Sequence, residues 1–321
     1  MTKQSAIELK PILKENVWGG SRLINEFHYV QEGDAAKKSG IGECWGVSAH
    51  ANGDCVVAQG PYQGKTLSWL YENRRDLFGN LKSPVFPLLV KIIDAADNLS
   101  IQVHPGDAYA MEHENGSLGK SECWYVMDAP EGAELIVGHN AKTKEELEDL
   151  VHSGRYDELI RKIPVQKGDF VQIAAGTVHA ITAGILVLEI QQSCDITYRV
   201  YDYGRLVNGK LRPLHIRQSL DVINVPDDSD KRAFTHAKEL PENELCQLVA
   251  CDKYKVWKVN VSGDFETEQD EPFMILSVVE GEGKLGERSL GRGDHVLLPT
   301  GYGKICLSGQ LECILSAPNE A

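Results

Sequence analysis

The segment LSIQVHPGDA, residues 99–108, combines an amide and an imidazole at a spacing that could bind a metal ion. Side chains alternate between the two faces of a β-strand, so Ser100, Gln102 and His104 are predicted to lie on one face. Amide oxygen and imidazole nitrogen both bind divalent metals. Two donors do not complete a metal site, and the rest must come from other segments.

Two further donors occur at separated positions. Glu122 directly precedes the strand-like segment CWYVM, and His179 lies in GTVHAI. Together with Gln102 and His104 they form a mixed nitrogen and oxygen set that suits one divalent transition metal per chain, most simply zinc. The alternative is that the histidines are ordinary buried residues with satisfied hydrogen bonds.

An internal repeat helps to choose between these interpretations. In the first half, Gly168-Asp169 leads through FVQI to His179. In the second half, Gly293-Asp294 leads through HVLL to Lys304 with the same spacing. Each copy has a turn at glycine and aspartate, an apolar strand, and one side chain at the position where the first copy has its histidine.

The second copy lacks the donors of the first. Aligning YVMDA (125–129) with SVVEG (277–281) places Met274 opposite Glu122, as Lys304 is opposite His179. Two donors are therefore present together in one copy and missing together from the other. This correlation favours metal ligands over ordinary buried histidines.

Short apolar segments separated by Gly, Pro, Asp or Asn predict a mainly β fold. The repeat resembles the two motifs of the cupin family, which implies two cupin (jelly-roll) β-barrels. A few helices, predicted at 66–79, 142–154 and 213–224, would cover them. A polar break at 225–244 predicts a catalytic, metal-binding domain over 1–240 and a degenerate cupin-like domain without metal ligands over 241–321. A single barrel with insertions is the alternative.

Polar and apolar residues alternate along the segment VLEIQQSCDITYRVY (187–201). Even positions are mostly apolar, whereas odd positions, including Glu189, Asp195 and Arg199, are polar. We expect the polar face to line a wet interior near the metal rather than the outer surface. Lys91, within the apolar PLLVKIID, and Lys120 add positive charge, and such a pocket suits a phosphorylated or carboxylated small molecule.

Composition limits the partners of the chain. A formal net charge of −14 over 321 residues disfavours nucleic acid and anionic membranes as partners. No segment resembles a transmembrane helix or a signal peptide, so we expect a cytoplasmic protein. Eight cysteines without a CxxC pair predict reduced thiols rather than a cysteine zinc site. Nothing in the sequence indicates an oligomeric state.

Four motifs, LSIQVHP, KSECWYV, GTVHAI and QQSCDITYRVYDYGR, occur in the order found in the type I mannose-6-phosphate isomerases. The chain resembles the short bacterial form of this family from NVWGG (16–20) through the second barrel. The resemblance implies a zinc-dependent interconversion of mannose 6-phosphate and fructose 6-phosphate through a cis-enediol or enediolate. It implies metal ligands at Gln102, His104, Glu122 and His179, the active-site arginine at Arg199, and pocket positions at Trp18, Lys91, Ser100, Lys120, Glu189 and Asp195.

The roles within this site are hypotheses. Arg199 and Lys120 would stabilise the negative charge of the intermediate. Glu189 is the favoured catalytic base, with Asp195 or a metal-bound hydroxide as alternatives. Cys194 stands where the short bacterial form of the family more often has serine. It is expected to point away from the polar face of its strand. The rival interpretations are a metal-dependent cupin oxygenase and a non-catalytic, sugar-phosphate-binding bicupin.

Overall fold

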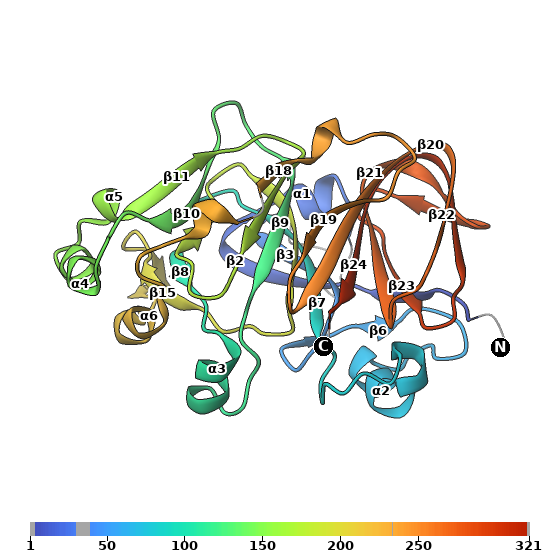
Figure 1. Ribbon diagram of the computed structural model, residues 1–321, viewed down its shortest axis with the longest axis horizontal. Helices are drawn as coiled ribbons and strands as arrows, with labels where there is room; N and C mark the ends of the chain where they lie inside the picture. The colour runs from blue at the N-terminus through green and yellow to red at the C-terminus, as the bar shows by residue number, and fades with distance from the viewer. Residues whose placement is uncertain (1–3, 30–38, 233, 320–321) are drawn as a thin grey trace.

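The computed structural model describes residues 4–29, 39–232 and 234–319. As predicted, the fold is mainly β. Three sheets of eight, seven and five strands form the body of the molecule, and short helices lie at its periphery (Figure 1). No helix in the described part of the chain is long and apolar enough to cross a membrane.

The first barrel consists of the seven-stranded and five-stranded sheets. The seven-stranded sheet has the order β18 (Phe234–His236), β12 (Asp169–Ile173), β9 (Glu122–Asp128), β14 (Leu186–Gln192), β7 (Leu88–Asp94), β3 (Ile41–Val47) and β2 (Ile12–Gly20). The five-stranded sheet has the order β11 (Ile160–Pro164), β10 (Glu134–His139), β13 (His179–Ala180), β8 (Ile101–Val103) and β15 (Tyr198–Tyr201). Each neighbouring pair is antiparallel.

The eight-stranded sheet forms the C-terminal half, at the right of Figure 1. Its order is β19 (Cys246–Ala250), β20 (Tyr254–Glu268), β24 (Lys304–Pro318), β21 (Phe273–Leu285), β23 (His295–Pro299), β1 (Ile7–Lys10) and β6 (Val56–Val57), with β22 (Arg288–Gly291) beside β21. The strands β1 and β6 come from the first 57 residues, so the N-terminal segment completes the C-terminal sheet. Two small hairpins join β4 (Ala49–His50) to β5 (Gly53–Asp54) and β16 (Leu206–Val207) to β17 (Lys210–Leu211).

The helices cover the outer faces and ends of the sheets. All three predicted helical segments are confirmed, as α2 (Leu67–Asn73) with the 3₁₀ turn η1 (Arg75–Phe78), α4 (Lys144–His152) and α6 (Ile216–Val222). The remaining helical segments are α1 (Arg22–Asn25), α3 (Asp107–His113), α5 (Tyr156–Leu159), η2 (Ser229–Lys231) and η3 (Ala237–Glu239). Helix α4 begins at the N-cap Thr143, whose hydroxyl accepts the Glu146 N–H, and buries Leu147, Leu150 and Val151.

Side-chain alternation on the shared strands separates two hydrophobic cores. On β9, Trp124 and Val126 face the interior of the first barrel, whereas Cys123, Tyr125 and Met127 face the core shared with the eight-stranded sheet. Glu122 has the parity of Trp124 and therefore points into the first barrel. The second barrel thus covers the back of the sheet that carries the candidate site.

A buried polar contact joins these layers. The Lys258 ammonium donates to the Tyr125 hydroxyl at 2.9 Å and pairs with Glu312 at 2.8 Å. Lys258 also donates to the Ala237 carbonyl at 2.9 Å, so its three donors are used. This lysine fixes the back of β9 against the second barrel.

The register of the strands agrees with the internal repeat. In the first barrel Glu122 pairs with Ile173 across β9 and β12, and in the second Met274 pairs with Leu298 across β21 and β23. Leu298 is the residue that the repeat aligns with Ile173. Met274 is buried in the second hydrophobic core, and Lys304 reaches Glu266 in an exposed ion pair.

Candidate metal centre and active-site cavity

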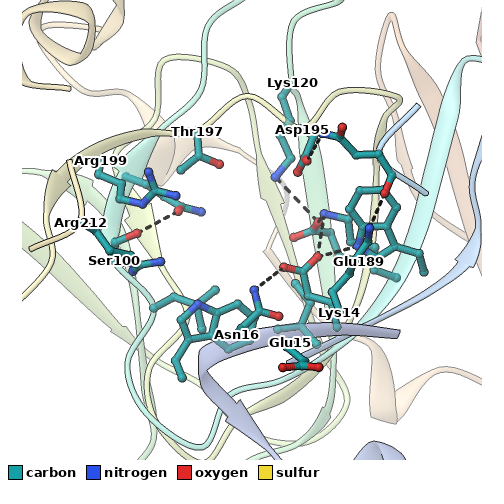
Figure 2. A pocket seen from close by; sticks show the side chains of 18 of the residues that line it. Lys14, Glu15, Asn16, Ser100, Lys120, Glu189, Asp195, Thr197, Arg199 and Arg212 are labelled. Atoms are coloured by element: carbon teal, nitrogen blue, oxygen red, sulfur yellow. Dashed lines mark hydrogen bonds and ion pairs between the residues drawn. The ribbon is translucent and has the colours of Figure 1, made fainter. Parts of the chain in front are cut away.

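A cavity of about 650 Å³ opens at the interior face of the first barrel. Side chains from both of its sheets surround the cavity (Figure 2). The predicted residues that line it are Trp18, Lys91, Ser100, Gln102, Lys120, Glu189, Asp195 and Arg199. His104, Glu122 and His179 are fully buried near its floor, with donor atoms that all lie within 4.8 Å of one another. The structure therefore brings together all eleven predicted site residues.

Strand pairing explains why distant segments meet here. Strand β8 lies between β13 and β15, so Gln102 is opposite His179 on one side and opposite Arg199 on the other. Its neighbours Ile101 and Val103 point the other way, into the core beneath the helices. Cross-strand neighbours place their side chains within contact distance, so one strand aligns an amide, an imidazole and a guanidinium.

The two imidazoles are held with their Nε2 atoms toward each other. His104 Nδ1 donates to the Ile196 carbonyl at 2.7 Å, and His179 Nδ1 donates to the Thr177 carbonyl at 2.8 Å. This leaves a lone pair on each Nε2, and the two nitrogens are 3.1 Å apart. Two facing acceptors repel unless a cation lies between them, and a metal-binding imidazole usually donates its other ring N–H to a backbone carbonyl, as both histidines do here.

Burial keeps both imidazoles neutral. It lowers the pKa of His179 to about 4, against the weaker effect of the Thr177 carbonyl. For His104, burial, then the charge of Lys120, and then His179 hold the pKa well below the usual 6.5. Neutral imidazole is the form that binds metals, so no proton has to leave near neutral pH.

The carboxylate of Glu122 completes the donor group. Its Oε1 lies 3.4 Å from His179 Nε2, and its Oε2 lies 3.5 Å from His104 Nε2. A tetrahedral zinc ion with ligands at its usual distances has donor atoms about 3.3 Å apart. Its Oε1 is buried without a hydrogen-bond donor, whereas its Oε2 is paired with an ammonium, that of Lys120, at 2.6 Å. The separations, the unsatisfied Oε1 and the facing nitrogens all fit a small divalent cation.

Gln102 is adjacent, with its amide turned the other way. Its Nε2 lies 3.4 Å from His179 Nε2, while its Oε1 accepts from the Ser100 hydroxyl at 3.3 Å. An amide binds a metal through oxygen, because its nitrogen has no free lone pair. A half-turn about the last side-chain torsion would bring Oε1 to the metal position and Nε2 to the serine.

Lys120 contacts the donors Glu122 and His104 from the side of the cavity. Its ammonium is 2.6 Å from Glu122 Oε2, 3.8 Å from Glu189 Oε1, and donates to His104 Nε2 at 3.1 Å. Burial alone would lower its pKa, but Glu122 and Glu189 outweigh burial and raise it. The backbone fixes the position as well, since the Lys120 N–H donates to the Pro105 carbonyl.

A row of polar residues crosses the seven-stranded sheet beside the metal site. Trp45, Lys91, Glu189 and Trp124 are successive cross-strand neighbours on β3, β7, β14 and β9. The Lys91 ammonium lies 3.3 Å from Glu189 Oε1 and 3.3 Å from Glu43 Oε2, and Trp124 donates to Glu189 Oε2 at 3.2 Å. Burial opposes the charge on Lys91, yet Glu43 and Glu189 raise its pKa. Glu189 is thus buried, fixed by its neighbours and close to the cavity.

Two arginines lie on the opposite wall, together with Ser100 and Thr197 (Figure 2). Asp202 accepts from Arg212 Nε and Nη2, both at 2.6 Å. Arg199 is half-buried, its Nε has no hydrogen-bond partner, and it makes no ion pair with a carboxylate in the described ranges. Burial, then the neighbouring Arg212, lower its pKa. A guanidinium left unpaired in this way is available to an anionic ligand.

The rest of the lining provides an apolar wall and a polar rim. Trp18 is buried against Leu99 and Ile93, and these three side chains together form an apolar part of the cavity wall. Asp195 is exposed at the rim, where it accepts from the Asn52 side chain at 2.9 Å. Cys194 is buried outside the lining, as expected, and all eight cysteines are free thiols.

Several residues that line the cavity were not predicted from the sequence: Lys14, Glu15, Asn16, Glu43, Trp45, Asn52, Arg212 and His215. Thr197 lines it too and lies on the predicted polar face, but it was not singled out as a site residue. A signal existed for Arg212, because Asn208-Gly209 marks a two-residue hairpin turn just before it, and both residues have positive φ. Glu43 and Trp45 alternate within the strand IGECWGV. His215 had no signal of its own, since it falls within the predicted helix at 213–224, whereas the observed helix begins one residue after it.

Comparisons with known proteins agree with this geometry. The family model "Phosphomannose isomerase type I, catalytic domain" matches residues 6–132, and "Mannose-6-phosphate isomerase, cupin domain" matches residues 244–318. Mannose-6-phosphate isomerase ManA of Bacillus subtilis (strain 168) is 47% identical over 312 residues, which cover 96% of this chain and 97% of that protein. Mannose-6-phosphate isomerase of Streptococcus mutans is 46% identical over 97% of this chain and 98% of its own length.

A solved structure supports the same relationship. The crystal structure of the mannose 6-phosphate isomerase from Bacillus subtilis superposes with a TM-score of 0.88 at 40% sequence identity, over 98% of this chain and 99% of that one. The sequence similarity and the shared fold therefore both extend over nearly the whole length. The chain belongs to the type I phosphomannose isomerase family.

Proposed function

We propose that this protein is a zinc-dependent aldose–ketose isomerase that interconverts mannose 6-phosphate and fructose 6-phosphate. The observation that carries the proposal is the pair of Nε2 atoms 3.1 Å apart, each 3.4 to 3.5 Å from an oxygen of the buried Glu122 carboxylate. That group could hold a cation at the floor of a cavity with an unpaired guanidinium on its wall. The full-length similarity to proteins named for this activity gives independent support.

The proposed ligands are His104, Glu122 and His179, with Gln102 after rotation of its amide. Zinc suits two imidazoles and a carboxylate, and it would act as a Lewis acid toward the oxygens of the sugar.

The charge of the cavity suits a phosphorylated sugar. Although the whole chain carries a net charge of −14, the cations that line the cavity slightly outnumber the carboxylates. The cations are Lys14, Lys91, Lys120, Arg199 and Arg212, and the carboxylates are Glu15, Glu43, Glu189 and Asp195. The Trp18 ring offers a flat surface for the carbon skeleton, while the polar rim can bind hydroxyl groups. We propose that Trp18, Lys91, Ser100 and Asp195 contact the substrate or shape its subsite.

The isomerisation requires proton transfer between the first two carbons. A base removes the proton from the second carbon of the aldose to give an enediolate, the hydroxyl proton moves from the second oxygen to the first, and the base returns its proton to the first carbon to give the ketose. Arg199 and Lys120 would stabilise the negative oxygen, since both are cations fixed before the reaction begins. Glu189 is the proposed base, because it is a buried carboxylate directly beside Lys120 and the metal position.

Glu189→Gln tests the base. The substitution keeps the shape of the side chain but removes its basicity, so we expect turnover to fall by about 100-fold or more. The exchange of the carbon-bound hydrogen of the substrate with solvent should be lost as well, as measured by NMR in deuterated water. Glu43→Gln is the matched control, because it also removes one carboxylate from Lys91, and it should retain the exchange. If Glu189→Gln still exchanges the hydrogen, Glu189 is not the base.

A coupled assay tests the proposed reaction. Mannose 6-phosphate should be converted into fructose 6-phosphate, and mannose without the phosphate should be converted far less efficiently. Oxygen consumption together with bound iron would instead indicate a cupin oxygenase. Binding of the sugar phosphate without conversion would indicate a non-catalytic bicupin. We also propose that residues 1–240 form the catalytic, metal-binding domain and that 241–321 form a degenerate cupin-like domain without metal ligands, whose sheet is completed by β1 and β6 from the N-terminal segment.

A further inference from the structure

His215 is joined to Arg199 by two hydrogen bonds. The His215 N–H donates to the Arg199 carbonyl at 2.8 Å, and the Arg199 N–H donates to His215 Nδ1 at 3.1 Å. Both backbone groups of the arginine are therefore satisfied by one residue from another segment. His215 also lines the cavity and is half-buried.

This contact occurs where the sheet itself provides little support. Strand β15 is at the edge of the five-stranded sheet, with β8 as its neighbour on one side only. The pairing of β15 with β8 is also irregular, since the register shifts between Arg199 and Tyr201. An edge residue next to such an irregularity has free backbone groups and a loosely set direction. His215 takes the place of a missing neighbouring strand at this residue.

The imidazole of His215 is committed to this contact. His215 is the N-cap residue of α6, but its side chain makes no capping hydrogen bond to that helix. Instead it turns back to β15, where an Nδ1 that accepts must be unprotonated. Burial, followed by the charge of Arg199, lowers the pKa of His215, and Glu114 opposes this shift. The ring is therefore kept in the neutral form that the contact requires.

We infer that His215 is a positioning residue, which fixes the backbone of Arg199 and so directs its guanidinium into the cavity. The inference rests on the proposed role of Arg199 in the isomerase. In this role the imidazole acts by accepting the Arg199 N–H at Nδ1, and it does not contact the substrate. Arg199 has no carboxylate partner among the described residues, so no ion pair compensates for the loss of this support.

Two substitutions separate this role from others. In asparagine, Oδ1 is bonded to Cγ as Nδ1 is in histidine, so His215→Asn keeps an acceptor for the Arg199 N–H. His215→Phe keeps a ring of similar size without any acceptor. We expect His215→Phe to lower kcat by about tenfold or more with unchanged metal content, because a displaced catalytic group slows the reaction. His215→Asn should recover most of this loss.

Two further measurements make the result decisive. The exchange rate of the Arg199 amide hydrogen should rise in His215→Phe and stay near the wild-type rate in His215→Asn. In a background of Arg199→Ala, His215→Phe should cause little additional loss, because the two residues act through one group. If the phenylalanine variant does not fold, His215→Leu provides the same comparison.

Three outcomes would overturn the inference: wild-type kcat in His215→Phe, an asparagine variant as impaired as the phenylalanine variant, or additive losses in the Arg199→Ala background. An impaired asparagine variant would mean that Nε2 acts on the substrate directly. If the wild-type protein does not convert mannose 6-phosphate, the proposed function fails. The amide exchange pattern would still decide the positioning role in that case.

Discussion

Replacing His179 with alanine should abolish both the retention of metal and the turnover of mannose 6-phosphate. The substitution removes one of the two Nε2 atoms that lie 3.1 Å apart, and it leaves Glu122 with a single imidazole partner. We expect the metal content after dialysis to fall from about one ion per chain to near zero, and kcat/KM to fall by at least about 1,000-fold. Elemental analysis and the coupled assay measure the two effects on the same sample.

His139→Ala is the matched control for this substitution. His139 is also a buried imidazole of the five-stranded sheet, but its Nε2 is bonded to the Asn224 carbonyl outside the cavity. The control should lose some stability and keep its metal. An active His179→Ala protein without metal would remove the proposed centre altogether.

Replacing Arg199 with alanine should reduce kcat by about 100- to 1,000-fold while the metal content stays unchanged. A preorganised cation that stabilises charge mainly in the transition state affects kcat more than KM. Arg199→Lys should retain part of the activity, because it keeps the charge but not the planar arrangement of donors. Steady-state kinetics with a metal determination distinguishes this loss from that of His179→Ala.

Arg217→Ala provides a control on a nearby element, since Arg217 is an exposed residue of α6. It should have nearly wild-type kinetics. Near-normal turnover of Arg199→Ala would show that this guanidinium does not stabilise the reaction.

Much of the site could be predicted because β-strands impose simple rules. Alternation placed Glu189, Asp195 and Arg199 on the wet side of a segment whose even positions pack, and all three line the cavity. The repeat predicted which copy carries the donors, and the register of Met274 with Leu298 agrees with the alignment. Both inferences depend on local periodicity, which is encoded in short stretches of sequence.

Contacts between distant segments could not be predicted in the same way. The sequence does not indicate that β1 pairs with β23 in the C-terminal sheet. Nor does it indicate that Lys91 forms ion pairs with both Glu43 and Glu189. The link between His215 and Arg199 depends on the irregular edge of a sheet, and the direction of the Gln102 amide depends on the Ser100 hydroxyl. These features follow from tertiary packing and from single hydrogen bonds rather than from periodicity.

The most direct test of the central claim is the coupled assay on the wild-type protein after its metal has been removed by a chelator and then restored. If a divalent cation held by His104, Glu122 and His179 is required, conversion of mannose 6-phosphate should disappear on chelation. About one equivalent of zinc per chain should restore it. Full conversion by protein shown to be free of metal would contradict the proposed mechanism.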